Sequence, residues 1–292
     1  MELNTYFQGL LSNIEPDDKA VAKAKKAHGD LREILKNDKQ ISDADPDTYL
    51  AGSYARDTAI NYIKDVDVIL LVDLDNNKTS PDVAVAWVQA SLQEHYSKVI
   101  PQGRSVQVKT DSGFELDVVP SIPIGDRNGP ILIPDRDIKN WVASHPKGQI
   151  AFGVDKNKAT GECYKPLVKI MKFWRDRFSS ETAKVKSYIL ENLIGENLTG
   201  QPSCYDSGVV SILQNVYQRY AVYLNTRVVP RIMDLGYPSV NVAKRWKFNE
   251  FAAFMEEVRK SQMIANSALE SQSEQESIKL WRQLFGTKFE SK

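Results

Sequence analysis

An Asp-x-Asp pair opens the apolar run DVDVILLVD, in which Asp65 and Asp67 are separated by a single valine. On a β-strand, side chains two positions apart point to the same face, so the two carboxylates are expected about 6 to 7 Å apart along the chain. Two close anions repel each other unless a cation lies between them. Mg²⁺ prefers oxygen ligands and is typically held by one or two carboxylates together with substrate phosphates. The pair therefore suggests a divalent-cation site that serves a phosphate-bearing substrate.

A third carboxylate completes the usual two-metal site, and the later run FELDVVP offers two candidates. Strand alternation places Glu115 and Asp117 on one face and the intervening apolar residues on the other. Asp117 is preferred because it lies deeper in the apolar run, where a carboxylate costs more to bury without a cation. Glu115 stays open as the alternative. Two ions held about 3.5 to 4 Å apart would stabilise the attacking and leaving oxygens of a phosphoryl displacement.

The plain interpretation of Asp65 and Asp67 is a pair of solvated acids at the start of a strand, because short motifs often match by chance. The preceding Gly52-Ser53 favours the functional interpretation. A glycine turn lets backbone N–H groups approach an anion, and a serine at a helix start adds a hydroxyl donor. The two features together predict a triphosphate site beside a metal site.

A second Asp-x-Asp, formed by Asp73 and Asp75, closes the same apolar run. At about 3.3 Å per residue, Asp73 lies roughly 20 Å from Asp67 on a straight strand, which is too far for a shared metal. The following Asn-Asn-Lys has a turn composition. We expect both acids to be solvated at the strand end.

The elements that must position these residues differ between the two halves of the chain. Short β-branched runs bounded by turn residues predict strands in the first half, together with helices over 17–36 and 81–98. After Pro146, apolar spacing of three and four predicts helices near 163–178, 184–195, 206–225 and 247–285. We therefore predict an α/β (α+β) protein, with an N-terminal helix and mixed-sheet catalytic lobe over 1–145 and a helical lobe over 146–292.

Composition excludes several classes of protein. Lys and Arg number 38, as do Asp and Glu, so no overall basic field favours RNA. Two cysteines and three histidines are too few for a Cys/His zinc module, and the histidines receive no chemical role. Neither a secretion signal nor an 18-residue apolar stretch is found. The expected location is the reducing cytoplasm, with no membrane partner.

The order of sequence blocks resembles one enzyme family. GSYARDTAI, DVDVILLV, ELDVVPSIP, KPLVKIMKFWRD, KSYILENLI and SIKLWRQLFGTKF follow one another between about residues 47 and 289. This order is similar to that of the bacterial cyclic GMP-AMP synthase/DncV-like nucleotidyltransferases, relatives of oligoadenylate synthases in the DNA polymerase beta superfamily. The resemblance implies a sheet lobe packed on a helical lobe, with the active site in the cleft between them. It also implies synthesis of a cyclic di- or trinucleotide second messenger, with release of pyrophosphate, in anti-phage signalling.

The resemblance assigns roles by position. Asp65, Asp67 and Asp117 would hold two Mg²⁺ ions, with Mn²⁺ as an alternative, and Asp117 would also help deprotonate the attacking ribose hydroxyl. Gly52 and Ser53 would bind the donor triphosphate. In place of a glycine that the family often has after the arginine, this chain has Asp57, which adds a negative charge near the expected phosphate loop.

Family position also points to residues of the helical lobe. Lys165, Lys169 and Lys172 form one stripe of a helix, and a solvated lysine face is the plain interpretation. The resemblance favours Lys172, then Lys169, as triphosphate ligands, with Ser187 as a hydroxyl donor. Tyr205 could stack on a base, although packing is an equal alternative. The C-terminal apolar residues Trp281, Leu284 and Phe285 are expected to pack structurally.

The expected partners are nucleoside triphosphates, ATP among them, and a separate effector protein that responds to the product. A monomer is expected. Whether a regulatory protein, a peptide or an RNA activates the enzyme is left open, as are the bases used. The alternative functions are nucleotide addition to RNA or protein, and a catalytically silent nucleotide-binding module.

Overall fold

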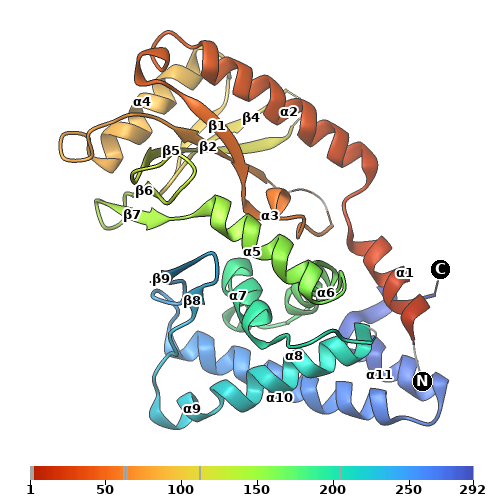
Figure 1. Cartoon of the computed structure of the whole chain (residues 1–292). Helices are drawn as coiled ribbons and strands as arrows, with labels where there is room; N and C mark the ends of the chain where they lie inside the picture. Colours follow the sequence, from red (N-terminus) through yellow and green to blue (C-terminus); the bar gives the residue numbers. More distant parts are fainter. Residues whose placement is uncertain (1–2, 62, 64, 112, 204, 292) are drawn as a thin grey trace. The chain divides into compact units, whose positions relative to one another are not determined.

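The computed structural model describes residues 3–61, 63, 65–111, 113–203 and 205–291 (Figure 1). The chain divides into two compact units, one formed by Pro16–Ala151 and the other by Met1–Glu15 together with Phe152–Lys292. The division falls within helix α5 (Pro146–Ala159). The domain boundaries expected from the sequence stay a prediction.

The unit Pro16–Ala151 is built on a mixed sheet. Within the described residues, seven strands pair along the path β1-β2-β5-β4-β3, and β6 joins β5 to β7. Strands β2 and β5 are parallel, and the other pairings among the described strands of this sheet are antiparallel. The strands are β1 (Asp47–Ala51), β2 (Asp65–Leu71), β3 (Val99–Pro101), β4 (Val106–Lys109), β5 (Glu115–Pro123), β6 (Ile131–Asp135) and β7 (Asn140–Ser144).

One face of this sheet forms the main core of the unit. Helices α2 (Asp18–Asn37) and α4 (Pro81–Gln93) lie alongside the sheet (Figure 1). Their apolar residues, such as Leu31 and Val88, pack with Val66, Val68 and Val118 of the strands. Because strand side chains alternate between faces, this packing sends the odd-numbered residues of β2 and β5 to the opposite face.

The opposite face is apolar at one end and acidic at the other. Ile69, Leu71 and Val119 form a small cluster there, with Tyr49 of β1 packed against it. The acidic residues lie at the beginnings of β2 and β5, before this cluster. The alternation therefore separates a buried sheet surface from a charged one on the same strands.

The second unit is mostly helical. Its longer helices are α1 (Asn4–Ile14), α6 (Tyr164–Asp176), α7 (Ser187–Asn197), α8 (Tyr205–Tyr220), α10 (Phe248–Glu270) and α11 (Glu274–Phe285). Short segments complete it: η2 (Glu181–Ala183), α9 (Val222–Thr226), η3 (Gly286–Lys288) and the ribbon β8 (Met233–Asp234) with β9 (Tyr237–Asn241). Phe7 of α1 packs against the rings of Trp281, Phe285 and Phe289, all fully buried. The structural packing expected for the C-terminal helix is confirmed.

The structure confirms the α/β class and differs from the sequence-based expectation in several elements. The β8–β9 ribbon lies in the half of the chain that the sequence predicts to be a helical lobe. Its turn sequence Leu235-Gly236-Tyr237-Pro238 carries no strand pattern of its own. Helix α5 was not predicted, since PKGQIAFGVDKNKA has two glycines and no apolar spacing of three and four. The expected helix over 247–285 is two helices that meet at Ser271–Ser273. In the described part of the chain, no helix has both the length and the apolar composition required to cross a membrane.

Candidate active site

The acidic residues of the Pro16–Ala151 unit meet on two neighbouring strands. Asp67 of β2 pairs directly with Asp117 of β5, and Asp65 pairs with Glu115 in the same parallel register. Because side chains alternate along strands and the register is parallel, all four carboxylates lie on one face of the sheet. The structure therefore places the three predicted metal ligands together, with Glu115 as their neighbour.

Burial and mutual repulsion perturb two of these groups. Burial is the main cause that raises the pKa of Asp67 to about 6, and the charge of Asp65 adds to the effect while Arg56 opposes it. Burial, followed by the charges of Asp67 and Asp65, raises the pKa of Asp117 to about 7. Both effects penalise the ionised carboxylate and would be relieved by a nearby cation.

Asp117 has an unsatisfied carboxylate oxygen. The residue is 9% exposed, and its Oδ1 atom is buried without a hydrogen-bond partner among the described residues. Gln107, which is opposite Asp117 on β4, makes a side-chain hydrogen bond to this carboxylate, and this bond acts to lower its pKa. A buried acceptor without a partner is costly, so the Oδ1 atom is suited to a ligand that the protein itself does not supply.

These donors fit a divalent metal. Hard divalent cations take carboxylate oxygens, and two neighbouring carboxylates with raised pKa values, one of which has a buried oxygen without a hydrogen-bond partner, meet that requirement. Among the described residues, no three His, Cys, Asp or Glu side chains are already clustered closely enough to form a ready metal site. Asp65, Asp67 and Asp117 repel each other, which agrees with carboxylates that lie on neighbouring positions without pointing to one common centre.

The Gly-Ser turn adjoins the same carboxylates. Gly52 follows β1, whose last residue Ala51 pairs with Asp67, and Gly52 and Ser53 begin the single helical turn α3 (Gly52–Ala55). Gly52 has a φ of 69°, which favours glycine over other residues. Asp57, just after this turn, has a φ of 55°. Glycine adopts this left-handed conformation without strain, and aspartate is among the other residues that tolerate it.

The other acids near these strands have cationic neighbours. Asp73 is 59% exposed and pairs with Arg127 at 2.9 Å, while Asp75, 44% exposed, pairs with Lys78 at 3.3 Å. Both lie at the strand end and in solvent, as expected. Glu115 lies 3.8 Å from Lys109 of the adjacent strand, so it has a cationic neighbour of its own.

The predicted lysines lie in the helical unit and have carboxylate partners. Lys172 of α6 forms an ion pair with Glu191 of α7 at 2.5 Å, and both side chains are almost fully buried. Lys169 pairs with Glu15 at 2.9 Å. One interpretation of the lysine stripe was a face exposed to solvent. Lys169 and Lys172 are buried, so that interpretation is wrong for these two residues. Their contact with a triphosphate stays a prediction.

Ser187 and Tyr205 begin two helices of the same unit. Ser187 is exposed at the start of α7, and its hydroxyl accepts a hydrogen bond of 2.9 Å from Arg175. Tyr205 begins α8 and is half-buried, with its ring centroid 6.3 Å from that of Phe7. This packing matches the structural alternative for Tyr205, and a role in base stacking stays a prediction.

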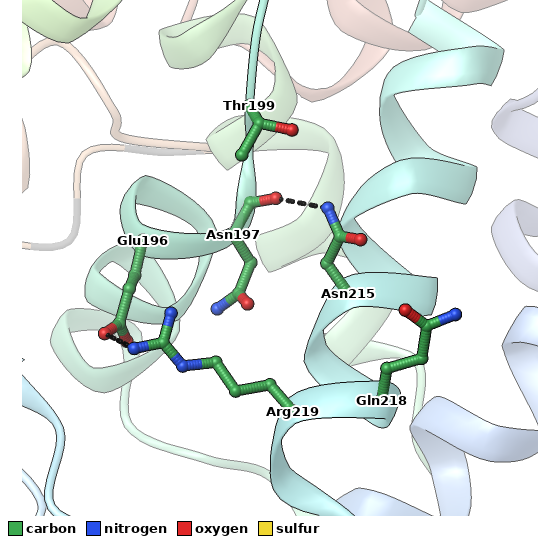
Figure 2. Close-up of a pocket in the computed structure, with 6 residues that line it drawn as sticks. All are labelled: Glu196, Asn197, Thr199, Asn215, Gln218 and Arg219. Carbon is green, nitrogen blue, oxygen red and sulfur yellow. Dashed lines mark hydrogen bonds and ion pairs between the residues drawn. The ribbon is translucent and has the colours of Figure 1, made fainter.

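A separate polar pocket lies between α7 and α8 (Figure 2). Its volume is about 440 Å³, and it is lined by Glu196, Asn197, Thr199, Asn215, Gln218 and Arg219. Arg219 reaches Glu196 at 2.5 Å, and the Asn215 amide donates to the Asn197 carbonyl at 2.8 Å. None of the residues predicted from the sequence lines this pocket.

Sequence reasoning missed three residues that adjust the site or its expected ligands. Gln107 was missed because it lies on another strand and only the antiparallel register of β4 brings it to Asp117. Arg56 belongs to the Gly-Ser turn, where its charge lowers the pKa of Asp67. Glu191 is a buried acid in the segment KSYILEN. An acidic residue within an apolar helical segment is the sequence signal that could have indicated a cationic partner.

Comparisons with known proteins agree with this geometry. Residues 1–157 match the family described as the Second Messenger Oligonucleotide or Dinucleotide Synthetase domain. A cyclic AMP-AMP-AMP synthase of Acinetobacter sp. is 32% identical over 99% of this chain and 86% of its own length. A probable cyclic AMP-AMP-GMP nucleotide synthase of Salmonella paratyphi B is 31% identical over 99% of this chain and 92% of its own length.

The fold also matches solved structures. CdnC of E. coli MS115-1, in a complex with a HORMA protein, aligns with a TM-score of 0.79 and 16% identity over 99% of this chain and 98% of that chain. The same protein with ATP aligns with a TM-score of 0.78 over 99% of each chain. At this level of identity the comparison establishes the fold.

Proposed function

The chain belongs to the Second Messenger Oligonucleotide or Dinucleotide Synthetase family of nucleotidyltransferases, which make cyclic oligonucleotides, and we propose that its product is a cyclic trinucleotide containing adenylate. Both relatives described above align with nearly the whole chain and are named for cyclic trinucleotide synthesis, one from AMP alone and the other from AMP and GMP. Their shared use of adenylate supports ATP as a substrate.

The register that pairs Asp67 with Asp117 is the observation that carries the proposed nucleotidyl-transfer chemistry. Nucleotidyltransferases of this family use divalent metals. We assign Asp65, Asp67 and Asp117 as ligands of two Mg²⁺ ions, for which Mn²⁺ could substitute. When bound, the ions supply positive charge that stabilises the attacking and leaving oxygens of a phosphoryl displacement.

The chain's own residues account for binding and proton transfer. Gly52 and Ser53 are assigned to the donor triphosphate, aided by Lys169, Lys172, Ser187 and Tyr205 of the helical unit. The ribose hydroxyl of the acceptor nucleotide attacks the α-phosphorus, a new phosphodiester bond forms, and pyrophosphate leaves. Asp117 helps to deprotonate this hydroxyl, a role open to a carboxylate that lies beside Asp67 on the acidic face of the sheet. Repetition on the linear product and closure on its own triphosphate yields the ring.

The enzyme is proposed to act in anti-phage signalling, as a monomer whose product activates a separate effector protein. A regulatory protein partner is also proposed. The E. coli relative was solved in complex with a HORMA protein, which supports that kind of partner.

Product analysis tests the proposed reaction. The purified chain is incubated with ATP, GTP, CTP, UTP and Mg²⁺, and parallel reactions contain a chelator or omit single triphosphates. We expect a phosphatase-resistant product with the mass of a cyclic trinucleotide, dependent on both ATP and the metal. Label that appears only on added RNA or protein would instead establish nucleotide transfer to a macromolecule. If nucleotides bind and no product forms, even with a HORMA-type partner, the chain is a silent binding module.

A further inference from the structure

Gly52 and the Asp67 carboxylate lie in direct contact. A Cβ atom added to Gly52 would lie 1.7 Å from Oδ2 of Asp67 and 2.8 Å from its Cγ. Non-bonded atoms cannot approach this closely. A side chain at position 52 would therefore force the Asp67 carboxylate out of its present position. The space beside the glycine Cα is already filled by the acidic group.

The surrounding sheet prevents the strand itself from moving away. Asp67 pairs with Ala51 on one side and with Asp117 on the other, so its backbone is fixed between two strands. Its neighbours Val66 and Val68 are fully buried in the core on the opposite face. Because such cores are close-packed, relief of a clash has to come from rotation of the Asp67 side chain or distortion of the Gly52 turn.

We propose that Gly52 is a positioning residue for Asp67, in addition to any contact that its backbone makes with phosphate. The absence of a side chain at position 52 lets the Asp67 carboxylate pack against the turn and fixes its direction on the acidic face. The inference rests on the proposed function, because Asp67 is there a metal ligand. A substitution at position 52 would then act through Asp67 and weaken metal binding, although residue 52 is not itself a ligand.

A matched control separates this contact from backbone strain. Gly125, in the turn between β5 and β6, has a φ of 77° and no atom within 4 Å of an added Cβ. Gly125→Ala therefore carries the cost of a left-handed alanine without a clash, whereas Gly52→Ala carries both.

The first test is a double-mutant cycle on stability in metal-free protein. Thermal unfolding is measured for Gly52→Ala, Asp67→Ala, the double variant and Gly125→Ala. We expect Gly52→Ala to lower the Tm more than Gly125→Ala does in the wild-type background. With Asp67→Ala present, the contacts at 1.7 and 2.8 Å disappear and the Cβ of residue 67 lies 3.3 Å from the added Cβ, so the loss should shrink to about that of the control.

An equal loss in both backgrounds would overturn the proposal. If Gly52→Ala alone fails to fold, recovery of a folded protein in the double variant gives the same support, and failure of both contradicts it. This cycle requires no activity, so it stays decisive even if the proposed reaction is wrong.

The second test measures metal affinity and kinetics of the folded variants. Mn²⁺ binding, followed by electron paramagnetic resonance, should weaken by about 10- to 100-fold in Gly52→Ala and not in Gly125→Ala. In the family reaction, kcat should fall with Gly52→Ala and not with Gly125→Ala. If Mn²⁺ affinity is unchanged and only the KM for triphosphate rises, Gly52 acts on the phosphate alone and the positioning role is wrong.

Discussion

At the scale of single residues, the site is defined by carboxylates held where they repel each other. Asp67 and Asp117 are neighbours on paired strands, and both have pKa values well above the ordinary value. A fold kept for structure alone gains nothing from such an arrangement. The residue-level predictions follow from this repulsion.

Asp67→Asn should abolish cyclic product formation while the Tm stays equal or rises. The amide keeps the shape of the side chain and removes one of the repelling charges, but it is a poor ligand for a hard cation. Product yield and thermal unfolding of the same preparation provide the measurement. A large fall in Tm would mean that the carboxylate is needed for folding, and the catalytic assignment would lose its support.

The stability of metal-free protein should depend on the ionisation of Asp117. Its pKa is about 7 in the folded protein and about 3.8 as the ordinary value, so the folded state holds this proton more tightly. The unfolding free energy contributed by the group therefore falls as pH rises from about 4 to about 7, and levels off above that range.

The difference between wild type and Asp117→Asn isolates this contribution. Groups that do not interact with Asp117 titrate equally in both proteins, so the Tm of wild type relative to the variant should decline across that pH range in the presence of a chelator. Mg²⁺ added at pH 7.5 should raise the wild-type Tm more than that of Asp117→Asn. A constant difference across the range would contradict the raised pKa.

At the scale of elements, two pairings organise the molecule's chemistry. The parallel pairing of β2 with β5 gathers the acids, and β4 adds Gln107 beside Asp117. In the helical unit, α6 and α7 are joined by the buried pair of Lys172 and Glu191. The second pairing leads to a stability prediction.

Glu191→Gln should destabilise the protein by about 3 to 5 kcal/mol, since it leaves the buried Lys172 charge without its carboxylate. The double variant with Lys172→Met removes both charges and should lose less than the sum of the two single changes. Urea unfolding measures all three. The exposed pair of Lys279 and Glu276, 3.5 Å apart, serves as the control, where Glu276→Gln should change stability by less than about 1 kcal/mol. Equal effects at the two pairs would contradict the prediction.

At the scale of the whole molecule, the two ends of the chain belong to one packed unit. Helix α1 contributes Phe7 to a ring cluster with Trp281, Phe285 and Phe289, more than 270 positions away in sequence. Residues 1–15 therefore group with Phe152–Lys292 even though Pro16–Ala151 separates them in sequence.

Phe7→Ala should cost about 3 to 5 kcal/mol of unfolding free energy, because it removes a fully buried ring from a close-packed cluster. Gln8→Ala, at an exposed position of the same helix, should cost well under 1 kcal/mol. Chemical denaturation of both variants checks the difference. A small loss for Phe7→Ala would mean that α1 is only loosely docked in the second unit.

The sequence alone determined the fold class, the main strands, and the parity that puts Asp65 and Asp67 on one face. These features follow from local periodicity, since alternation and apolar spacing are properties of neighbouring residues. The order of motifs also identified the family, because it covers most of the chain. The weakly patterned elements α5 and β8–β9 had no such local signal and were missed.

Only the tertiary structure decided which residues meet. Local sequence patterns do not specify contacts between segments that are separated in the chain. Such contacts include the pairing of Asp67 with Asp117, the position of Gln107, the partner of Lys172 and the contact of Gly52 with Asp67. The raised pKa values depend on burial and on neighbouring charges, which exist only once the strands have paired. Residue types thus fixed which chemistry was available, and packing fixed which atoms are placed to perform it.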